Sequence, residues 1–119
     1  MGSPVTQWQM LSKNPDRTAQ FYSQMFGWTV SADNPLGYRQ VAPHSTGGIE
    51  GGIRPAPPEA PSFVQLFITV DDMQAQVSKA TALGARVLIP PQTLPEGDQL
   101  AIPLDPEGMS FELHYRSAN

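Results

Sequence analysis

The feature that most constrains this chain is an order of strands and a helix that occurs twice, once on each side of a proline-rich segment. Four prolines fall within residues 55–61, near the middle of the 119 residues. Proline lacks the backbone N–H that helices and central strands need, so this segment is predicted to be a stiff connector. A repeat with a period of about 60 residues predicts two similar modules.

The first half begins with a strand and a helix. Residues 5–11 include good strand formers and no strand breaker. Asn14 and Pro15 indicate a helix start, because asparagine caps helices and proline fits the first helical position, where no N–H is needed. The helix is predicted to end at Gly27. Three short strands are predicted to follow, at residues 28–31, 38–42 and 48–53.

The second half has the same order. Residues 63–70 form the strongest predicted strand, and Asp71 and Asp72 are suited to cap a helix that begins near Met73 and ends at Gly84. A turn over residues 105–108 precedes the last strand. Three strands are predicted after the helix, at residues 86–89, 99–103 and 109–115.

Both halves therefore have the order β-α-β-β-β, which predicts an α+β fold class. We expect one domain over residues 1–119. Its predicted parts are module one at about 4–54, the connector at 55–62 and module two at about 63–117.

Composition excludes several functions. Hydrophobic residues make up 39% of the chain and charged residues 15%, as in globular proteins. The net charge is −4 and the seven basic residues are scattered, so a nucleic-acid partner is not expected. There is no cysteine, which excludes disulfides and thiolate chemistry. No leader-like start or membrane-length apolar stretch is visible, so we expect a cytoplasmic protein with no membrane partner.

Alternation along the predicted strands separates an apolar face from a polar one. The apolar face of residues 63–70, made by Val64, Leu66, Ile68 and Val70, is predicted to pack under a helix. A solvent-exposed sheet face and a ligand site both explain the polar side chains, and the alternation alone does not decide between them. The polar faces carry Gln7, Gln9, Glu50, Gln65, Thr69, Ser110, Glu112 and His114.

The order of several short segments resembles the vicinal oxygen chelate superfamily, which includes glyoxalases, bleomycin-resistance proteins and dioxygenases. The resemblance extends from about Val5 to Tyr115. It implies two βαβββ modules whose curved mixed sheets enclose a cleft, often completed in a homodimer. The segments that carry it are Gln7–Met10, Asn14–Arg17, Phe21–Tyr22, Phe26–Trp28, Gly47–Ile53, Gln65–Asp72, Asp105–Gly108 and Phe111–Leu113.

The resemblance also implies four metal-ligand positions on the concave face, which correspond here to Gln7, Glu50, Gln65 and Glu112. Family members usually carry histidine at the first and third positions, whereas this chain has glutamine at both. Amide and carboxylate oxygens suit Mg²⁺ or Mn²⁺ better than Ni²⁺ or Zn²⁺. The residues therefore leave two alternatives: the protein binds a divalent metal (Mn, Mg, Ni or Zn), or it binds no cofactor. The glycine-rich strand leaves the alignment of Glu50 open by one residue.

Two functions follow from the resemblance. In a metal-dependent lyase or isomerase, Glu112 would be the catalytic residue that transfers a proton, with His114 as a neighbour on the same face. In a metal-free protein that binds or sequesters an antibiotic-type small molecule, aromatic and polar side chains would line the cleft. Both functions predict a small-molecule partner and a homodimer. The candidate lining residues are Trp28, Tyr38, Arg39 and Phe67, while His44 is expected to lie in a loop without a role.

Overall fold

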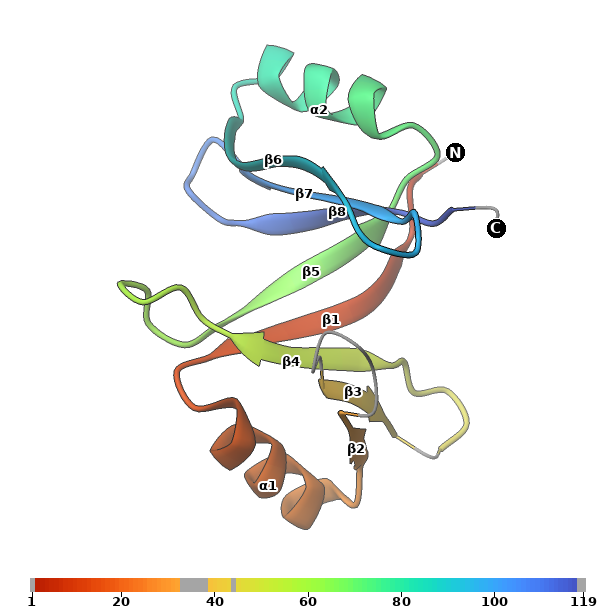
Figure 1. Cartoon of the computed structure of the whole chain (residues 1–119), viewed down its shortest axis with the longest axis vertical. Helices are drawn as coiled ribbons and strands as arrows, with labels where there is room; N and C mark the ends of the chain where they lie inside the picture. Colours follow the sequence, from red (N-terminus) through yellow and green to blue (C-terminus); the bar gives the residue numbers. More distant parts are fainter. Residues whose placement is uncertain (1, 33–38, 44, 118–119) are drawn as a thin grey trace. The chain divides into compact units, whose positions relative to one another are not determined.

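In a computed structural model the chain is described for residues 2–32, 39–43 and 45–117. It divides into two units: an N-terminal unit, Gln7–Val64, and a C-terminal unit, Gln65–Asn119 together with Met1–Thr6. Within the described residues each unit has one α-helix and strands that pair both parallel and antiparallel (Figure 1). The α+β fold class and the two βαβββ modules are confirmed.

The sheet of the N-terminal unit has the strand order β2-β3-β4-β1. Strands β1 and β4 run parallel, with Trp8 opposite Gly51, and the other pairs are antiparallel. Helix α1 (Pro15–Phe26) packs against β2 and β4 (Figure 1). The strands are β1 (Val5–Ser12), β2 (Thr29–Ser31), β3 (Arg39–Ala42) and β4 (Gly51–Pro55).

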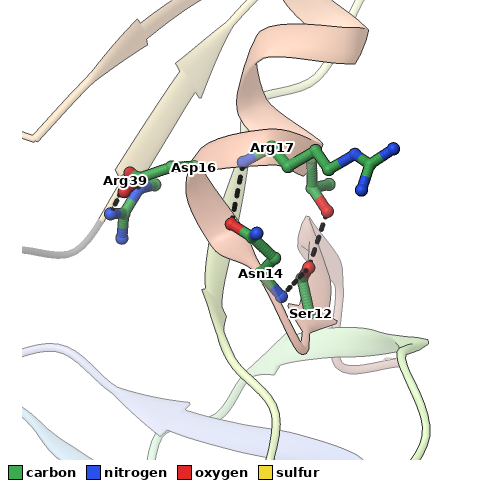
Figure 2. Close-up of polar contacts among 6 residues, drawn as sticks. Ser12, Asn14, Asp16, Arg17 and Arg39 are labelled. Atoms are coloured by element: carbon green, nitrogen blue, oxygen red, sulfur yellow. Dashed lines mark hydrogen bonds and ion pairs between the residues drawn. The ribbon is translucent and has the colours of Figure 1, made fainter.

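Helix α1 begins and ends where its residues predict. The side chain of Asn14 accepts a hydrogen bond from the backbone N–H of Arg17 at 3.1 Å, which satisfies one of the free donors of the first turn. The Ser12 hydroxyl accepts a hydrogen bond from the N–H of Asn14 at 3.0 Å and so fixes the entry of the chain (Figure 2). Gly27 ends the helix with a φ of +74°, a left-handed conformation that favours glycine.

Aromatic rings form the contact between α1 and the sheet. The ring centroids of Trp8 and Trp28 are 5.3 Å apart, those of Trp28 and Tyr22 are 5.6 Å apart, and those of Trp28 and Phe26 are 5.4 Å apart. A Cβ atom on Gly51 would lie 2.2 Å from the Trp8 ring, so only glycine allows this close approach. Trp28, a candidate lining residue, is part of this aromatic cluster.

The C-terminal unit repeats the arrangement, with the strand order β5-β8-β7-β6. Strands β5 and β8 run parallel, with Leu66 opposite Phe111. Helix α2 (Met73–Ala82) lies over β6, β7 and β8 (Figure 1). Residues before β1 join this unit, since the N–H of Thr69 donates to the carbonyl oxygen of Pro4 at 3.0 Å. The strands are β5 (Phe63–Thr69), β6 (Arg86–Thr93), β7 (Gln99–Leu104) and β8 (Phe111–Tyr115).

The core of the C-terminal unit lies between α2 and the sheet. Asp72 caps α2 by accepting a hydrogen bond from the N–H of Ala75 at 3.1 Å, as predicted. The buried core cluster consists of Val70, Met73, Ala101 and Leu113. Ile68, Val77, Phe111 and Tyr115 are half-buried against it. This packing explains why the apolar side chains of β8 alternate with polar ones.

The predicted burial of the β5 apolar face is only half right. Val70 is buried and Ile68 packs against the core, but Val64 and Leu66 are 65% and 52% exposed. The cause is the position of α2, which packs on β6, β7 and β8 and leaves the first half of β5 uncovered. Strand periodicity identifies the two faces but not how far a helix extends across one of them.

Several strand boundaries also differ from the prediction, most of all those of β4 and β6. Strand β4 begins at Gly51 rather than residue 48 and continues through Pro55, so Glu50 lies in the preceding loop. Strand β6 runs to Thr93 rather than residue 89, because its pairing with β7 continues through two register shifts. Over the part of the chain that the structure describes, neither helix is long or apolar enough to cross a bilayer.

Candidate functional site

Polar side chains of β5 and β8 share one face of the C-terminal unit. Because residues opposite each other on neighbouring strands point the same way, Phe67 lies beside Glu112 and Thr69 beside His114. Gln65 lies on the same face, two residues before Phe67. Gln65 and Glu112 are only 4% and 2% exposed. A solvent-exposed sheet face therefore does not account for these two residues.

The amide of Gln65 leaves one buried donor without a partner. Its Oε1 accepts a hydrogen bond from the hydroxyl of Ser110 at 2.9 Å. Its Nε2 is buried and has no hydrogen-bond partner among the described residues. A buried polar group left in this state costs about 1–3 kcal/mol, which marks Gln65 as a candidate binding residue.

His114 is fixed on the same face by two contacts. Its Nε2 lies 3.2 Å from Oδ2 of Asp98, and its ring lies 4.7 Å, centroid to centroid, from that of Phe67. Burial lowers the pKa of His114 below its ordinary value, although the neighbouring Asp98 acts in the opposite direction and Arg116 adds to the lowering. Sequence reasoning missed Asp98. The signal was its place directly before β7, whose Leu100 pairs with His114.

The N-terminal unit carries a different polar set. Gln9 is 1% exposed, and its Nε2 donates a long hydrogen bond of 3.4 Å to Oε1 of Gln7. Glu50 is exposed in the loop before β4. The structure thus places Gln7 and Gln9 on one strand face of this unit and Glu50 just before the strand that pairs with it.

Arg39 lies on the other face of the same sheet. It is opposite Ile53, which is opposite Met10, so it points away from the face of Gln7 and Gln9. Its guanidinium forms an ion pair with Asp16 of α1, with Nε donating to Oδ1 at 3.0 Å (Figure 2). The structure therefore gives Arg39 a contact between helix and sheet. Tyr38 and His44 lie outside the described residues.

The duplication allows the two units to be compared position by position. The N-cap residues Asn14 and Asp72 are 58 residues apart, and the same offset relates Gln7 to Gln65 and Gln9 to Phe67. Strand pairing then decides the remaining positions. Gln9 is opposite Gly52, whereas Phe67 is opposite Glu112. The N-terminal unit therefore has a glycine where the C-terminal unit has its buried carboxylate.

This comparison tests whether the residues present fit a resident metal. Gly52, not Glu50, occupies the position equivalent to Glu112. Of the four matching positions, which are Gln7, Gly52, Gln65 and Glu112, only the last therefore carries a carboxylate. An amide NH₂ cannot bind a cation, and the amide oxygens of Gln7 and Gln65, each of which accepts one hydrogen bond, are neutral ligands beside a single carboxylate. Over the described residues no three His, Asp or Glu side chains gather into a metal-binding group. The donor set does not fit a resident divalent metal.

The sequence-predicted residues are thus brought together in part. Gln65, Phe67, Glu112 and His114 share one face of the C-terminal unit, and Gln7 lies with Gln9 in the N-terminal unit. That the two sets form one site remains a prediction.

Two βαβββ modules, each with one helix and a mixed set of strands, define the class of proteins with the vicinal oxygen chelate fold. The model of the glyoxalase-like domain matches residues 9–114, so the chain belongs to this family. The curated relatives "Putative glyoxylase CFP32" of Mycobacterium bovis and Mycobacterium tuberculosis are 28% identical over 107 residues, which cover 88% of this chain. The chain spans 41% of the length of these relatives.

Solved structures confirm the fold. Methylmalonyl-CoA epimerase of Streptomyces coelicolor matches with a TM-score of 0.63 and 17% identity, over 98% of this chain and 96% of that one. A glyoxalase/bleomycin resistance protein/dioxygenase superfamily member of Vibrio splendidus matches with a TM-score of 0.63 and 12% identity, over 92% of this chain and 97% of that one. At these identities the similarity shows the vicinal oxygen chelate fold alone.

Proposed function

We propose that the chain binds a small molecule on the polar face of the C-terminal unit, without a resident metal. The ligand carries a carbonyl or carboxylate oxygen together with a hydroxyl or amine group. The observation that carries the proposal is the buried Nε2 of Gln65, which has no hydrogen-bond partner in the described residues. A carbonyl or carboxylate oxygen is the group that would satisfy this donor.

Neighbouring residues support the same ligand class. The carboxylate of Glu112 lies on the same face and suits a hydroxyl or amine donor. Phe67, 8% exposed, adds apolar surface between these polar groups. Small-molecule sites commonly combine a few convergent polar groups with an apolar lining. One of the similar structures is an epimerase of methylmalonyl-CoA, a compound that bears a free carboxylate.

A metal-dependent lyase or isomerase is the second candidate function. The buried carboxylate of Glu112 favours it, because a desolvated carboxylate is suited to proton transfer. The name of the curated relatives, a glyoxylase, points to the same kind of chemistry. Metal content separates the two candidates. Purified protein is incubated in turn with Mn²⁺, Mg²⁺, Ni²⁺ and Zn²⁺, then desalted and analysed by mass spectrometry. We expect no stoichiometric ion. One ion per chain would favour the lyase or isomerase.

Ligand binding tests the first proposal directly. Lactate and methylmalonyl-CoA are titrated into ¹⁵N-labelled protein, and pyruvate, which has no hydroxyl or amine group, serves as the comparison ligand. Binding should shift the amide signals of β5 and β8, and Gln65→Leu should weaken binding about 10-fold, as expected for one lost hydrogen bond of about 1.4 kcal/mol. The matched control is Gln92→Leu, which changes an exposed glutamine of β6 in the same unit. Equal affinity for wild type and Gln65→Leu would refute the proposal.

We further propose that the chain forms a homodimer. Large apolar side chains are exposed in both units: Phe21 and Met25 on α1 are 57% and 63% exposed, and Leu66 on β5 is 52% exposed. Exposed apolar patches commonly mark contacts with other proteins. Sedimentation velocity tests the proposal, with twice the chain mass of 12.9 kDa as the expected result and the single-chain mass as the result against it.

A further inference from the structure

Asp98 holds the imidazole of His114 with its second carboxylate oxygen. Its first oxygen, Oδ1, accepts a hydrogen bond from the backbone N–H of Ser117 at 2.8 Å, and its backbone carbonyl accepts one from the N–H of Leu94 at 2.7 Å. These bonds fix the carboxylate, so that Oδ2 faces Nε2 of His114 at 3.2 Å. The ring of Phe67 then limits rotation of the imidazole.

This contact decides which nitrogen of His114 carries the proton. A carboxylate only accepts hydrogen bonds, so a neutral imidazole beside it must carry its proton on Nε2. Nδ1 is then an acceptor, and it has no hydrogen-bond partner in the described parts of the chain. The side chain of His114 retains 13% of its exposure. The charged groups near it are Asp98, Arg116 and, two residues earlier on the same face, Glu112.

We propose that Asp98 is a positioning residue that fixes the tautomer of His114, so that Nδ1 accepts a hydrogen bond from a hydroxyl or amine group of the ligand. The part concerning the ligand rests on the proposed function. Gln65 lies four residues before Thr69, the residue opposite His114, which is about 13 Å along the strand, so the acceptor Nδ1 acts separately from the donor of Gln65. This acceptor favours molecules that carry a hydroxyl or amine, such as 2-hydroxy acids. A 2-keto acid offers no proton to Nδ1.

The tautomer is tested without any ligand by replacing Asp98 with asparagine. The Ser117 N–H can only donate, so in Asp98→Asn it keeps the oxygen of the new side-chain amide as its acceptor, and the amide NH₂ then faces Nε2 of His114. A donor at this place forces the proton of His114 onto Nδ1. Orientation of a histidine by a neighbouring carboxylate follows the same chemistry in known enzymes.

Long-range ¹H–¹⁵N correlation spectra at pH 8 report the tautomer. The chain has two histidines, so His44→Gln identifies the signals of His114. We expect the Nε2–H form in the wild type and the Nδ1–H form in Asp98→Asn. Asp105→Asn is the matched control, since Asp105 holds backbone N–H groups of a turn and contacts no histidine in the described chain. An Nδ1–H or mixed wild type, or an unchanged Asp98→Asn, would overturn the positioning role.

Lactate and pyruvate test the ligand part, since they differ in a hydroxyl and a keto group at the same carbon. The wild type should bind lactate about 10-fold more tightly than pyruvate, and Asp98→Asn should abolish this preference. A wild type that binds both equally contradicts the acceptor role of Nδ1. If the wild type binds neither compound, but the tautomer of His114 changes in Asp98→Asn as expected, the proposed ligand class is refuted and the positioning role of Asp98 is supported.

Discussion

The two units share a topology and an offset of 58 residues between their helix caps, but they bury different side chains. The N-terminal unit packs aromatic rings between helix and sheet and has Gly51 and Gly52 on the strand beside β1. The C-terminal unit packs aliphatic side chains and has Phe111 and Glu112 at the equivalent positions. Duplication therefore preserved the backbone pairing, while the side chains at matching positions diverged. Of these two strands, only that of the C-terminal unit carries a buried carboxylate.

The largest expected effect concerns the aliphatic core of the C-terminal unit. Leu113 is 4% exposed within it. Leu113→Ala should lower the free energy of unfolding in urea by about 3 kcal/mol, from lost burial and the cavity left behind. Leu88→Ala, at a 55% exposed position of β6, is the control and should change it by less than about 0.5 kcal/mol. Equal effects of the two variants would show that this core is not packed as described.

The glycine strand of the N-terminal unit gives the corresponding test there. Gly51→Ala should cost about 2 kcal/mol, because the new Cβ would overlap the Trp8 ring and force it out of place. The change should also alter the near-ultraviolet circular dichroism of the tryptophans. Gly2→Ala is the control, since nothing lies within 4 Å of a Cβ there. A Gly51→Ala variant as stable as the wild type would contradict the close packing of Trp8 on β4.

The helix caps compare the two units at matching positions. Asn14→Ala and Asp72→Ala should each lower the free energy of unfolding by about 1 kcal/mol, since each removes a side-chain acceptor at a helix N-terminus. The loss for Asp72→Ala should shrink at high salt, because only the aspartate adds a charge to the helix dipole. Urea unfolding at low and high salt measures both. If the loss of unfolding free energy in Asn14→Ala depends on salt as strongly as that in Asp72→Ala, the charge of Asp72 does not act on the helix dipole as proposed.

The smallest expected effect is a pH dependence from His114. Its pKa is lowered in the folded chain below the ordinary value of 6.5, so the unfolded chain binds the proton more readily. Stability is therefore retained above pH 6.5 and falls as the pH decreases through the lowered folded pKa. His114→Gln should flatten the pH profile of the free energy of unfolding in this range. A profile unchanged by His114→Gln would contradict the lowered pKa.

Much of the fold follows from short-range signals. The caps Asn14 and Asp72 and the stop at Gly27 are set by local hydrogen bonds and backbone geometry, which the residue types reveal. The start of β4 was misplaced because glycines carry no alternation of side chains to mark a strand. The exposure of Leu66 was missed because it depends on where α2 lies across the sheet.

The candidate site was predictable to a smaller extent. Alternation along β5 and β8 correctly grouped Gln65, Glu112 and His114 on one face. It could not show that Gln65 and Glu112 are buried, nor that Asp98 contacts His114, because both depend on the pairing of strands distant in the sequence. The equivalence of Glu112 with Gly52 likewise required the register of two parallel strand pairs.

The stacking of Trp8 on Gly51 has an optical consequence. The chain has two tryptophans, Trp8 and Trp28, and both belong to the N-terminal unit with their rings in contact. Indole emission therefore reports on one half of the molecule, and coupling between the two rings adds a chiral signal that vanishes once they separate. When this emission is recorded together with a signal from the whole backbone, it shows whether the two halves unfold together or one after the other.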